Sequence, residues 1–345
     1  MNKVQGAHPA RPETATSQAT QRPVDRMQAL VADDLAAVNR AITDRMQSRV
    51  GLIPDVGGHL VGAGGKRLRP LLTLVCAAML GYRQSRHVGL AACVEFIHSA
   101  TLLHDDVVDM SAKRRGRDTA NALWGNQASV LVGDYLFSRA FELMVADGSL
   151  RVLEILSQAS TVIAEGEVLQ LSTARDLTTT EPTYIEVVAA KTAALFAAAC
   201  EVAGVVAEAG TKTEQALHAY GRNLGIAFQI IDDMLDYDAD ESALGKAIGD
   251  DFDEGKVTLP IILAHARGDG EERAFWQRTI GKGQVEDGDL DHARALFARH
   301  GALEDTRKRA ESYADAARAA LADMPDNAYR TVLLDMVDFC LSRAY

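Results

Sequence analysis

Aromatic residues and net positive charge are both scarce in this chain. Phe, Trp and Tyr make up 6% of its 345 residues, and the formal net charge is −12. A protein that binds nucleic acid usually presents a basic surface, so the acidic balance argues against that class of protein. An anionic substrate would instead need local basic residues or bound metal ions. We therefore expect no nucleic-acid partner.

Cysteine is also sparse, and its spacing is not that of a metal site. Cys76, Cys93, Cys200 and Cys340 each lie among apolar residues, which predicts buried free thiols. Free thiols fit a reducing compartment, and no signal peptide is visible. These two features predict a cytoplasmic protein.

Long uninterrupted apolar runs are missing as well. The longest apolar stretch, at residues 187–206, contains Lys191 and Glu201. Charges near the middle of a membrane span are costly in lipid. We interpret this stretch as a buried helix and expect no transmembrane segment.

Strand-like alternation is almost absent, and helical periodicity dominates from about residue 25 onward. Residues 1–24, rich in Ala, Thr, Gln and Pro, lack this periodicity and are expected to be a disordered tail. Residues 25–345 are expected to form a single all-α domain, a large helical bundle around a central cavity. The expected helices span residues 26–48, 51–62, 68–80, 85–109, 119–146, 149–171, 183–208, 212–237, 257–266, 289–299, 304–322 and 327–343. The expected loops are 62–67, 81–86, 111–118, 174–182, 240–256 and 267–287.

One acidic motif occurs twice in the chain, each time at the end of an apolar helical stretch. Its carboxylates are Asp105, Asp106 and Asp109 in DDVVD and Asp232, Asp233 and Asp236 in DDMLD. Positions i, i+1 and i+4 of a helix share one stripe, so three carboxylates crowd together. Oxygen-rich sites of this kind suit Mg²⁺. Two facing clusters would hold several Mg²⁺ ions, and those ions would hold a polyphosphate.

A single such motif proves little, because charged helix ends are common. The alternative is that both motifs are solvated acidic helix ends. That alternative requires three crowded carboxylates twice without benefit, at helix C-termini where acids oppose the macrodipole. Because this unfavourable placement of acids occurs twice in the same way, it indicates function.

Three basic segments accompany the motifs. GAGGKRLRP, at residues 62–70, offers Lys66 and Arg69 beside glycines that allow close backbone approach. Its spacing is not that of a P-loop. The run KRRG at residues 113–116 follows the first motif, and LGKAIGDDFDEGKVTLP at residues 244–260 follows the second. Alone, each run would be a solvated loop. Beside metal clusters they indicate neutralisation of a diphosphate.

Together these segments resemble the trans-polyprenyl diphosphate synthases, and most closely the long-chain members that make quinone side chains. The residues that carry the resemblance are GGKRLRP, EFIHSATLLHDDVVD, KRRGRDTANALWGN, VLVGDYLFSRAF, EGEVLQL, AAKTAALF, GIAFQIIDDMLDY and GKAIGDDFDEGKVTLP. They appear in the family's order over about residues 30–265, and the C-terminal part is less similar. The resemblance implies head-to-tail condensation of isopentenyl diphosphate with an allylic diphosphate.

The resemblance also implies roles for individual residues. Three Mg²⁺ ions would be held by Asp105, Asp106, Asp109, Asp232 and Asp233. Asp236 would act through a water molecule, or would contact these ligands without binding the metal itself. The leaving diphosphate would be neutralised by Arg114, Lys191, Lys246 and Lys256 together with the metal. Isopentenyl diphosphate would be held by Lys66, Arg69, His98 and Arg115. Thr192 and Gln229 would lie near the allylic cation, and the released diphosphate would take the final proton.

The local sequence supports three of these roles, two by spacing and one by its apolar surroundings. His98 lies seven residues before Asp105, nearly on the same helix face, and Gln229 lies three before Asp232. In isolation His98 would more often be a core histidine. Lys191 stands in an Ala-rich apolar helix, where an unpaired charge is costly, so an anionic ligand is the better explanation.

Product length is expected to depend on the helix before the first motif. Short-chain relatives tend to carry a bulky residue four or five positions before the first aspartate, where this chain has Thr101 and Ala100. Ile97 lies about 12 Å below Asp105 and would not form an early floor. The small pair predicts an open tunnel, and the resemblance implies a product between octaprenyl and decaprenyl diphosphate. A Phe at Ala100 should then shorten the product.

Four alternatives remain open. A non-catalytic subunit of a heteromeric synthase would usually lack aspartates of one motif, and this chain has all six. A terpene cyclase would leave Lys66, Arg69 and Arg115 unexplained. A shorter-chain synthase uses the same chemistry, and a structural helical protein gives no reason for the paired acid clusters.

The resemblance further implies a homodimer with residues 119–146 at its interface, and it leaves room for a transient membrane contact at product release. Many relatives end in a basic tail that helps to close the site, whereas this chain ends in FCLSRAY with only Arg343. The segment 244–256 is then expected to contribute more to closure, or the tail to play no part.

Overall fold

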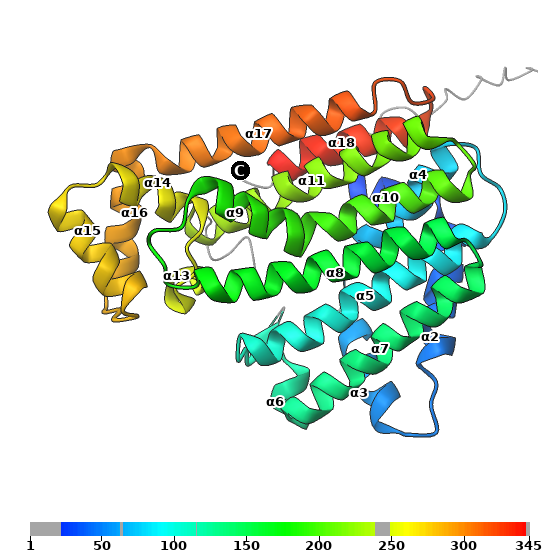
Figure 1. Cartoon of the computed structure of the whole chain (residues 1–345), viewed down its shortest axis with the longest axis horizontal. Helices are drawn as coiled ribbons and strands as arrows, with labels where there is room; N and C mark the ends of the chain where they lie inside the picture. Colours follow the sequence, from blue (N-terminus) through cyan, green and yellow to red (C-terminus); the bar gives the residue numbers. More distant parts are fainter. Residues whose placement is uncertain (1–21, 63–64, 115, 239–248, 343–345) are drawn as a thin grey trace, which may run out of the picture.

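Helices form nearly all of the regular structure in the computed structural model (Figure 1), which describes residues 22–62, 65–114, 116–238 and 249–342. The helices are α1 (Pro23–Leu30), α2 (Ala32–Met46), α3 (Leu52–Gly62), α4 (Leu68–Met79), α5 (Arg86–Val108), α6 (Ala120–Trp124), α7 (Asn126–Asp147), α8 (Leu150–Thr173), α9 (Glu181–Val188), η2 (Ala189–Ala193), α10 (Ala194–Val206), α11 (Thr211–Asp238), α13 (Asp250–Glu254), α14 (Leu259–Arg267), α15 (Gly270–Trp276), η3 (Gln277–Gly281), α16 (Asp289–His300), α17 (Ala302–Ala320) and α18 (Ala328–Ser342). Within the described ranges the strands are β1 (Lys113–Arg114) and β2 (Arg117–Asp118), an antiparallel pair. The predicted all-α fold is confirmed.

Several helix ends follow from local capping chemistry. The Ser149 side chain accepts a hydrogen bond from the Val152 amide at the start of α8, and Thr180 accepts one from the Thr183 amide at the start of α9. Pro182 occupies the first turn of α9, where its missing N–H costs nothing. These caps satisfy amides that the helices themselves leave free.

Some predicted boundaries were wrong. The helix expected at 26–48 is two helices, broken at Val31, and it begins at Pro23, inside the expected tail. The helix expected at 119–146 is broken at Gly125, whose φ of 83° ends α6. The loop expected at 267–287 contains α15 and η3, and the loop expected at 240–256 contains α13. A hairpin replaces part of the loop expected at 111–118.

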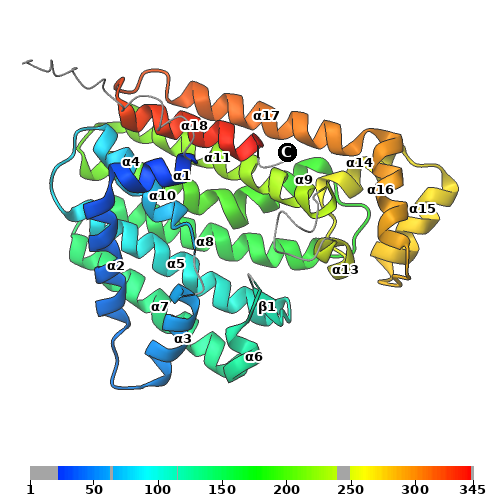
Figure 2. The same ribbon diagram turned by 180° about the vertical axis from the view of Figure 1, so that it is seen from behind.

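Two apolar cores share helices. The larger core is built mainly by α2, α4, α5, α7, α8, α10, α11 and α18, and the smaller one by α9, α11, α14, η3 and α16. α11 and α17 contribute side chains to both cores and so join them. Figures 1 and 2 show α8, α10, α11 and α17 running side by side along the long axis, with α14–α16 at one end. This side-by-side packing fixes where the motif-bearing ends of α5 and α11 lie.

The continuous helical run at Glu181–Val206 is long and apolar enough to cross a membrane, judged by length and composition alone. However, 78% of its most apolar window is buried inside the bundle. This burial agrees with the interpretation of residues 187–206 as a core helix. All four cysteines are buried and free, as predicted.

Candidate active site

A single cavity of about 1070 Å³ collects most of the predicted site residues. Those that line it are Lys66, Arg69, His98, Thr101, Asp105, Asp106, Asp109, Arg114, Lys191, Thr192, Gln229, Asp232, Asp233, Asp236 and Lys256. Arg115 and Lys246 lie outside the described residues. Both aspartate motifs therefore face the same space, as the repeated pattern predicted.

The first motif ends α5, and its middle aspartate is anchored by a cation. Asp106 is 1% exposed, and its Oδ1 accepts a hydrogen bond from Arg114 Nε at 2.9 Å and forms an ion pair with Arg114 Nη2 at 2.8 Å. Asn121 of α6 donates to the Asp106 carbonyl oxygen at 3.0 Å. Asp106 thus ties α5 to the hairpin and α6 while its neighbours face the cavity.

Asp105 lies in a strongly negative environment. Burial, together with the charges of Glu167 and Asp109, raises the pKa of its carboxyl from 3.8 to about 7, against the opposing effect of Lys191 and Arg114. A carboxyl group perturbed in this way by burial and like charges marks a candidate functional site. The site as built has surplus negative charge that a bound cation would neutralise.

The second motif lies near the end of α11, and its middle aspartate is anchored by neutral donors. The Asp233 carboxylate accepts a hydrogen bond from Tyr184 Oη at 2.6 Å on one oxygen. Its other oxygen accepts one from Gln229 Nε2 at 2.7 Å. Thr192 Oγ1 in turn donates to Gln229 Oε1 at 2.9 Å. Burial and the nearby Asp251 raise the pKa of Asp233, and the bonds from Tyr184 and Gln229 oppose that rise.

Lys191 reaches the cavity from η2, a π-helical turn between α9 and α10. Its Nζ donates to Glu167 Oε2 at 2.8 Å and to Gln170 Oε1 at 2.7 Å, and it lies 3.9 Å from an Asp105 oxygen. The explanation of Lys191 by an anionic ligand alone was therefore incomplete, because carboxylates of the protein also balance its charge. Gly166 permits this contact: a Cβ there would lie 2.7 Å from the Ala190 Cβ.

Lys256 lies beside α13, close to the second motif. Burial disfavours its charged form, but Asp251 and Glu254 outweigh burial, and the pKa of Lys256 is raised. Its Nζ lies 3.2 Å from Asp251 Oδ1. The Asp251 amide donates to Asp236 Oδ2 at 3.0 Å, which connects this segment to the second motif.

A basic end of the cavity lies at the start of α4. Arg69 Nη1 and His98 Nε2 are 3.0 Å apart, and the Arg69 guanidinium lies 4.7 Å from the centre of the Phe196 ring. Lys66 Nζ lies 5.6 Å from the centre of the Phe339 ring of α18. These cations face the same space as the acidic motifs, as the family resemblance implies.

Comparison with known proteins agrees with this geometry. The Polyprenyl synthetase family pattern matches residues 51–297. The octaprenyl diphosphate synthase of Escherichia coli strain K12 is 47% identical over 320 residues, which cover 93% of this chain and 99% of that protein. The chain belongs to the polyprenyl synthetase family.

Two solved structures of polyprenyl synthases are similar along nearly the whole chain. A decaprenyl diphosphate synthase from Rhodobacter capsulatus superposes with a TM-score of 0.91 at 56% identity, covering 94% of this chain and 100% of that one. A polyprenyl synthase from Caulobacter crescentus CB15, complexed with calcium and isoprenyl diphosphate, superposes with a TM-score of 0.88 at 53% identity. The superposition covers 93% of this chain and 98% of the Caulobacter chain.

The polyprenyl synthase residues fit Mg²⁺ bound together with a substrate. Among the described residues, no three His, Cys, Asp or Glu side chains converge closely enough to enclose a metal ion by themselves. Mg²⁺ typically takes one or two protein carboxylates and completes its shell with substrate phosphates and water. Carboxylates on two facing motifs, with room between them, match that pattern.

The cavity-facing side of α5 differs from the prediction for product length. Thr101 lines the cavity, but Ala100 and Ile97 are fully buried and do not. They share a helix stripe with Cys93 and His104, which contact the Ala140 and Val130 carbonyl oxygens of α7. Ala100 and Ile97 therefore face α7 and do not line this cavity, and their part in setting product length stays a prediction.

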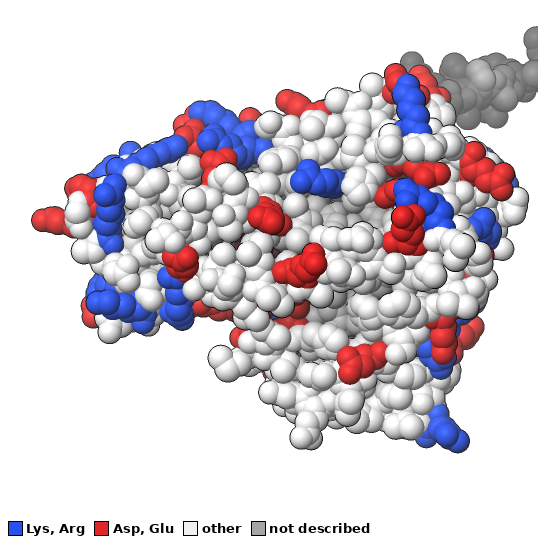
Figure 3. Space-filling view, in the orientation of Figure 1, with Lys and Arg blue, Asp and Glu red and all other residues white. Residues whose placement is uncertain are grey.

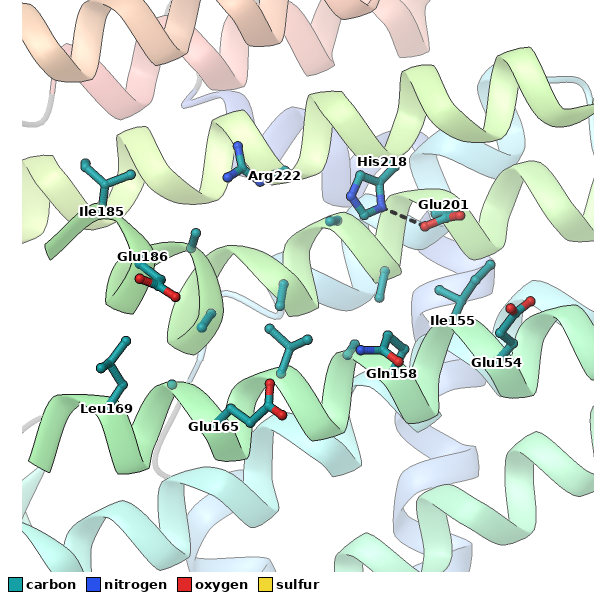
Figure 4. Close-up of a pocket in the computed structure, with 18 of the residues that line it drawn as sticks. Glu154, Ile155, Gln158, Glu165, Leu169, Ile185, Glu186, Glu201, His218 and Arg222 are labelled. Carbon is teal, nitrogen blue, oxygen red and sulfur yellow. Dashed lines mark hydrogen bonds and ion pairs between the residues drawn. The ribbon is translucent and has the colours of Figure 1, made fainter. Parts of the chain in front are cut away.

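A second cavity, a groove of about 710 Å³, lies on the outer face between α8 and α11, over α10 (Figure 4). Alanines of α10 form its floor. At one end Glu201 accepts hydrogen bonds from Arg151 and His218, both at 2.7 Å. Its lining includes no residue of either aspartate motif. This groove is therefore not the site of diphosphate chemistry.

Among the residues that sequence reasoning missed are five that contribute to the site. Arg67, the αL residue that precedes α4, pairs with the buried Glu95 of α5 at the basic end of the cavity. A lone acid in the apolar lead-in EFIHSATLLHDD was a usable signal for Glu95. Tyr184 had no such signal, because it lies in the sequence 49 residues before the aspartate that it contacts. Phe339 and Met336 of α18 also line the cavity.

Proposed function

We propose that this protein is a long-chain all-trans polyprenyl diphosphate synthase, a prenyltransferase that adds isopentenyl diphosphate head to tail onto an allylic diphosphate. The observation that carries the proposal is the shared cavity. Two aspartate motifs occupy one part of it, and a cluster of Lys66, Arg69 and His98 occupies another. One cavity can thus hold two diphosphates of different roles. The octaprenyl and decaprenyl synthases described above support a long-chain product.

The allylic diphosphate would bind between the motifs. Asp105, Asp109, Asp232 and Asp236 face the cavity and would hold Mg²⁺, while Asp106 and Asp233 anchor the motifs through their hydrogen bonds. Bound Mg²⁺ supplies Lewis-acid assistance to departure of the diphosphate. We propose three ions, as the family resemblance implies.

The cations of the chain complete the charge balance. Lys191 and Lys256 would orient the leaving diphosphate by exchanging their present carboxylate partners for phosphate oxygens. Arg114 would add its positive charge while its pair with Asp106 holds the first motif in place. Such preorganised charges stabilise the charge that develops as the C–O bond breaks. The Thr192 hydroxyl and the Gln229 amide would place their dipoles beside the allylic carbon.

Isopentenyl diphosphate would bind at the basic end, with its diphosphate on Lys66, Arg69 and His98. The double bond would then attack the allylic carbon from the neighbouring part of the same cavity. The proton lost afterwards would pass to the released diphosphate. Bidentate recognition of phosphate oxygens is the chemistry for which the Arg69 guanidinium is suited.

We also propose a homodimer that uses the α7 and α8 faces. Large apolar side chains are exposed along these helices, among them Leu131, Phe141, Val145, Leu150 and Val168. Figure 3 shows charged side chains gathering around α14–α17 and thinning over the central and lower part of the same view. Clustered exposed apolar residues are typical of association surfaces. The molar mass from light scattering, compared with that of Leu131→Glu, tests this interface.

Two further points remain proposals. The buried free thiols support a cytoplasmic location. A transient membrane contact would serve release of a product whose tail is insoluble in water. Localisation of the tagged full-length chain and its flotation with lipid vesicles test these two proposals separately.

The deciding experiment is incubation with Mg²⁺, farnesyl diphosphate and labelled isopentenyl diphosphate, followed by chromatographic sizing of the products. We expect products between octaprenyl and decaprenyl diphosphate. Products that stop at geranylgeranyl diphosphate would refute the long-chain part of the proposal, and no incorporation at all would refute synthase activity.

A further inference from the structure

Tyr184 of α9 makes a polar contact with the second aspartate motif that packing alone does not require. The side chain is 5% exposed and lies in the smaller apolar core with Val188, Ile230 and Met234. Its hydroxyl nevertheless donates to Asp233 Oδ2 at 2.6 Å. A phenylalanine would fill the same space without the hydroxyl, so the hydroxyl is the group that needs an explanation.

The position of Tyr184 is itself fixed from both sides. α9 begins with the Thr180 cap and Pro182, and Glu181 pairs with Arg309 of α17 at 2.9 Å. At its other end α9 continues directly into η2, which carries Lys191 and Thr192. The hydroxyl is thus presented to Asp233 from a braced helix and not from a loop.

Asp233 is held at both of its oxygens. Gln229, one turn earlier on α11, donates to Oδ1, and the Gln229 amide oxygen accepts from Thr192 of η2. Tyr184 supplies the donor that comes from α9. Without it, the carboxylate would keep the Gln229 bond alone and could rotate further into the cavity that it already lines, where it would disturb the charges of Asp232 and Asp236.

We propose that Tyr184 is a positioning residue for metal–diphosphate binding: by fixing Asp233, it orients the second motif so that Asp232 and Asp236 face the cavity. This inference rests on the proposed function. It assigns to α9 a role in the site beyond packing, and it couples α9 and η2 to α11 through one buried carboxylate. Tyr184 touches neither substrate nor metal in this role and acts through Asp233.

The test is Tyr184→Phe, which removes the hydroxyl and keeps the ring. Binding of Mg²⁺ with inorganic diphosphate is measured by titration calorimetry, and the Mg²⁺ dependence of turnover is measured alongside. We expect the dissociation constant for Mg²⁺–diphosphate and the half-saturating Mg²⁺ concentration to rise about tenfold, the size expected when a charged group loses one hydrogen bond. At saturating Mg²⁺, kcat should fall by much less.

Tyr220→Phe is the matched control. Tyr220 is buried as well, but its hydroxyl donates to the Leu333 carbonyl oxygen of α18 at 2.8 Å, away from either motif. The same chemical change there should leave the binding of Mg²⁺–diphosphate unchanged, whatever it does to the melting temperature. Equal loss of binding in both variants would overturn the proposal, because a general loosening of the bundle would then explain both.

A double-mutant cycle with Asp233→Asn identifies the route of the effect. If Tyr184 acts through Asp233, its replacement should add little once Asp233 is replaced, so the two losses should not be additive. Full additivity would overturn the proposal, as would a single Tyr184→Phe variant that binds like the wild type. An inactive wild type would refute the proposed function instead, which keeps the two failures distinguishable.

Discussion

The two aspartate motifs have nearly the same sequence but are held in place by different chemistry. In the first, Asp106 pairs with the charged Arg114 of the hairpin. In the second, Asp233 accepts hydrogen bonds from two neutral groups, Tyr184 and Gln229. The first motif is therefore positioned mainly by charge and the second mainly by directional hydrogen bonds. Equal motifs in a sequence need not respond equally to the same substitution.

The helices before the motifs differ as well. Four residues before the first aspartate, α5 presents the small Thr101 to the cavity. At the same position before the second motif, α11 presents Phe228, whose ring centroid lies 5.8 Å from that of Phe196. The cavity is thus left open along α5 and filled along α11. The difference predicts that the growing chain follows α5.

The largest expected effect tests what the two motifs share. Asp105→Ala should lower turnover about 1000-fold, since loss of a metal ligand removes several kcal/mol of transition-state stabilisation. Steady-state kinetics at saturating Mg²⁺ measure it. Asp323→Ala, which removes an exposed carboxylate paired with Lys212, is the control and should be neutral. A near-normal rate for Asp105→Ala would show that the motifs do not share the metal role.

The next prediction sharpens the contrast between the two lead-in helices. Thr101→Phe should shorten the product by several isoprene units, because the new ring would fill the open space along α5. Phe228→Leu, on α11, should leave the product within one unit of the wild type. Product sizing by chromatography distinguishes them. Equal shifts in both variants would contradict growth along α5.

Ala100→Phe, suggested by the sequence alone, has a different expected outcome in this structure. Ala100 is fully buried and shares its helix face with residues that contact α7. A ring there would overpack the α5–α7 contact and cost about 1–3 kcal/mol of unfolding free energy. Denaturant unfolding measures this cost. An unchanged stability together with a shorter product would restore Ala100 to the tunnel wall.

The smallest expected effect concerns stability in the absence of metal. The Asp105 carboxyl has a pKa raised from 3.8 to about 7 by burial and by Glu167 and Asp109. Between these two values the folded state binds more protons than the unfolded one. The stability that Asp105 provides is therefore complete below pH 3.8 and is lost as the pH rises through 7.

Asp105→Asn should accordingly raise the unfolding free energy at pH 8 by about 1–2 kcal/mol, and by less at pH 5. Asp106→Asn should lower it at both pH values, because Arg114 loses its charged partner. Urea unfolding in EDTA measures both variants. Destabilisation by Asp105→Asn at pH 8 would show that contacts of the Asp105 carboxylate already offset the cost of burying its charge.

The sequence was sufficient to predict those features of the site that depend on local spacing along one helix. Residues three, four and seven apart on one helix meet on one face, which is why His98, Gln229 and the six aspartates were predicted together. Tertiary partners have no such spacing, so Tyr184 and the carboxylate partners of Lys191 could not be found. Ala100 and Thr101 are neighbours in sequence, and only the position of α7 decides which of them faces the cavity.

One error had a local cause. The glycines and charges of segment 267–287 predict a loop, yet Asp269 and Glu272 form a capping box that starts α15. The buried Trp276 then packs that helix into the smaller core. The capping signal was present in the sequence and was outweighed by composition.

The π-helical turn η2 makes this part of the chain sensitive to changes in length. Each residue of an α-helix turns the chain by about 100°, so deleting one residue from Ala189–Ala193 would rotate α9 against α10. Tyr184 could then no longer meet Asp233 while Lys191 and Thr192 kept their places. Insertions and deletions should therefore be tolerated in the loops around this helical run and rejected within it, although its alanines make substitution there look harmless.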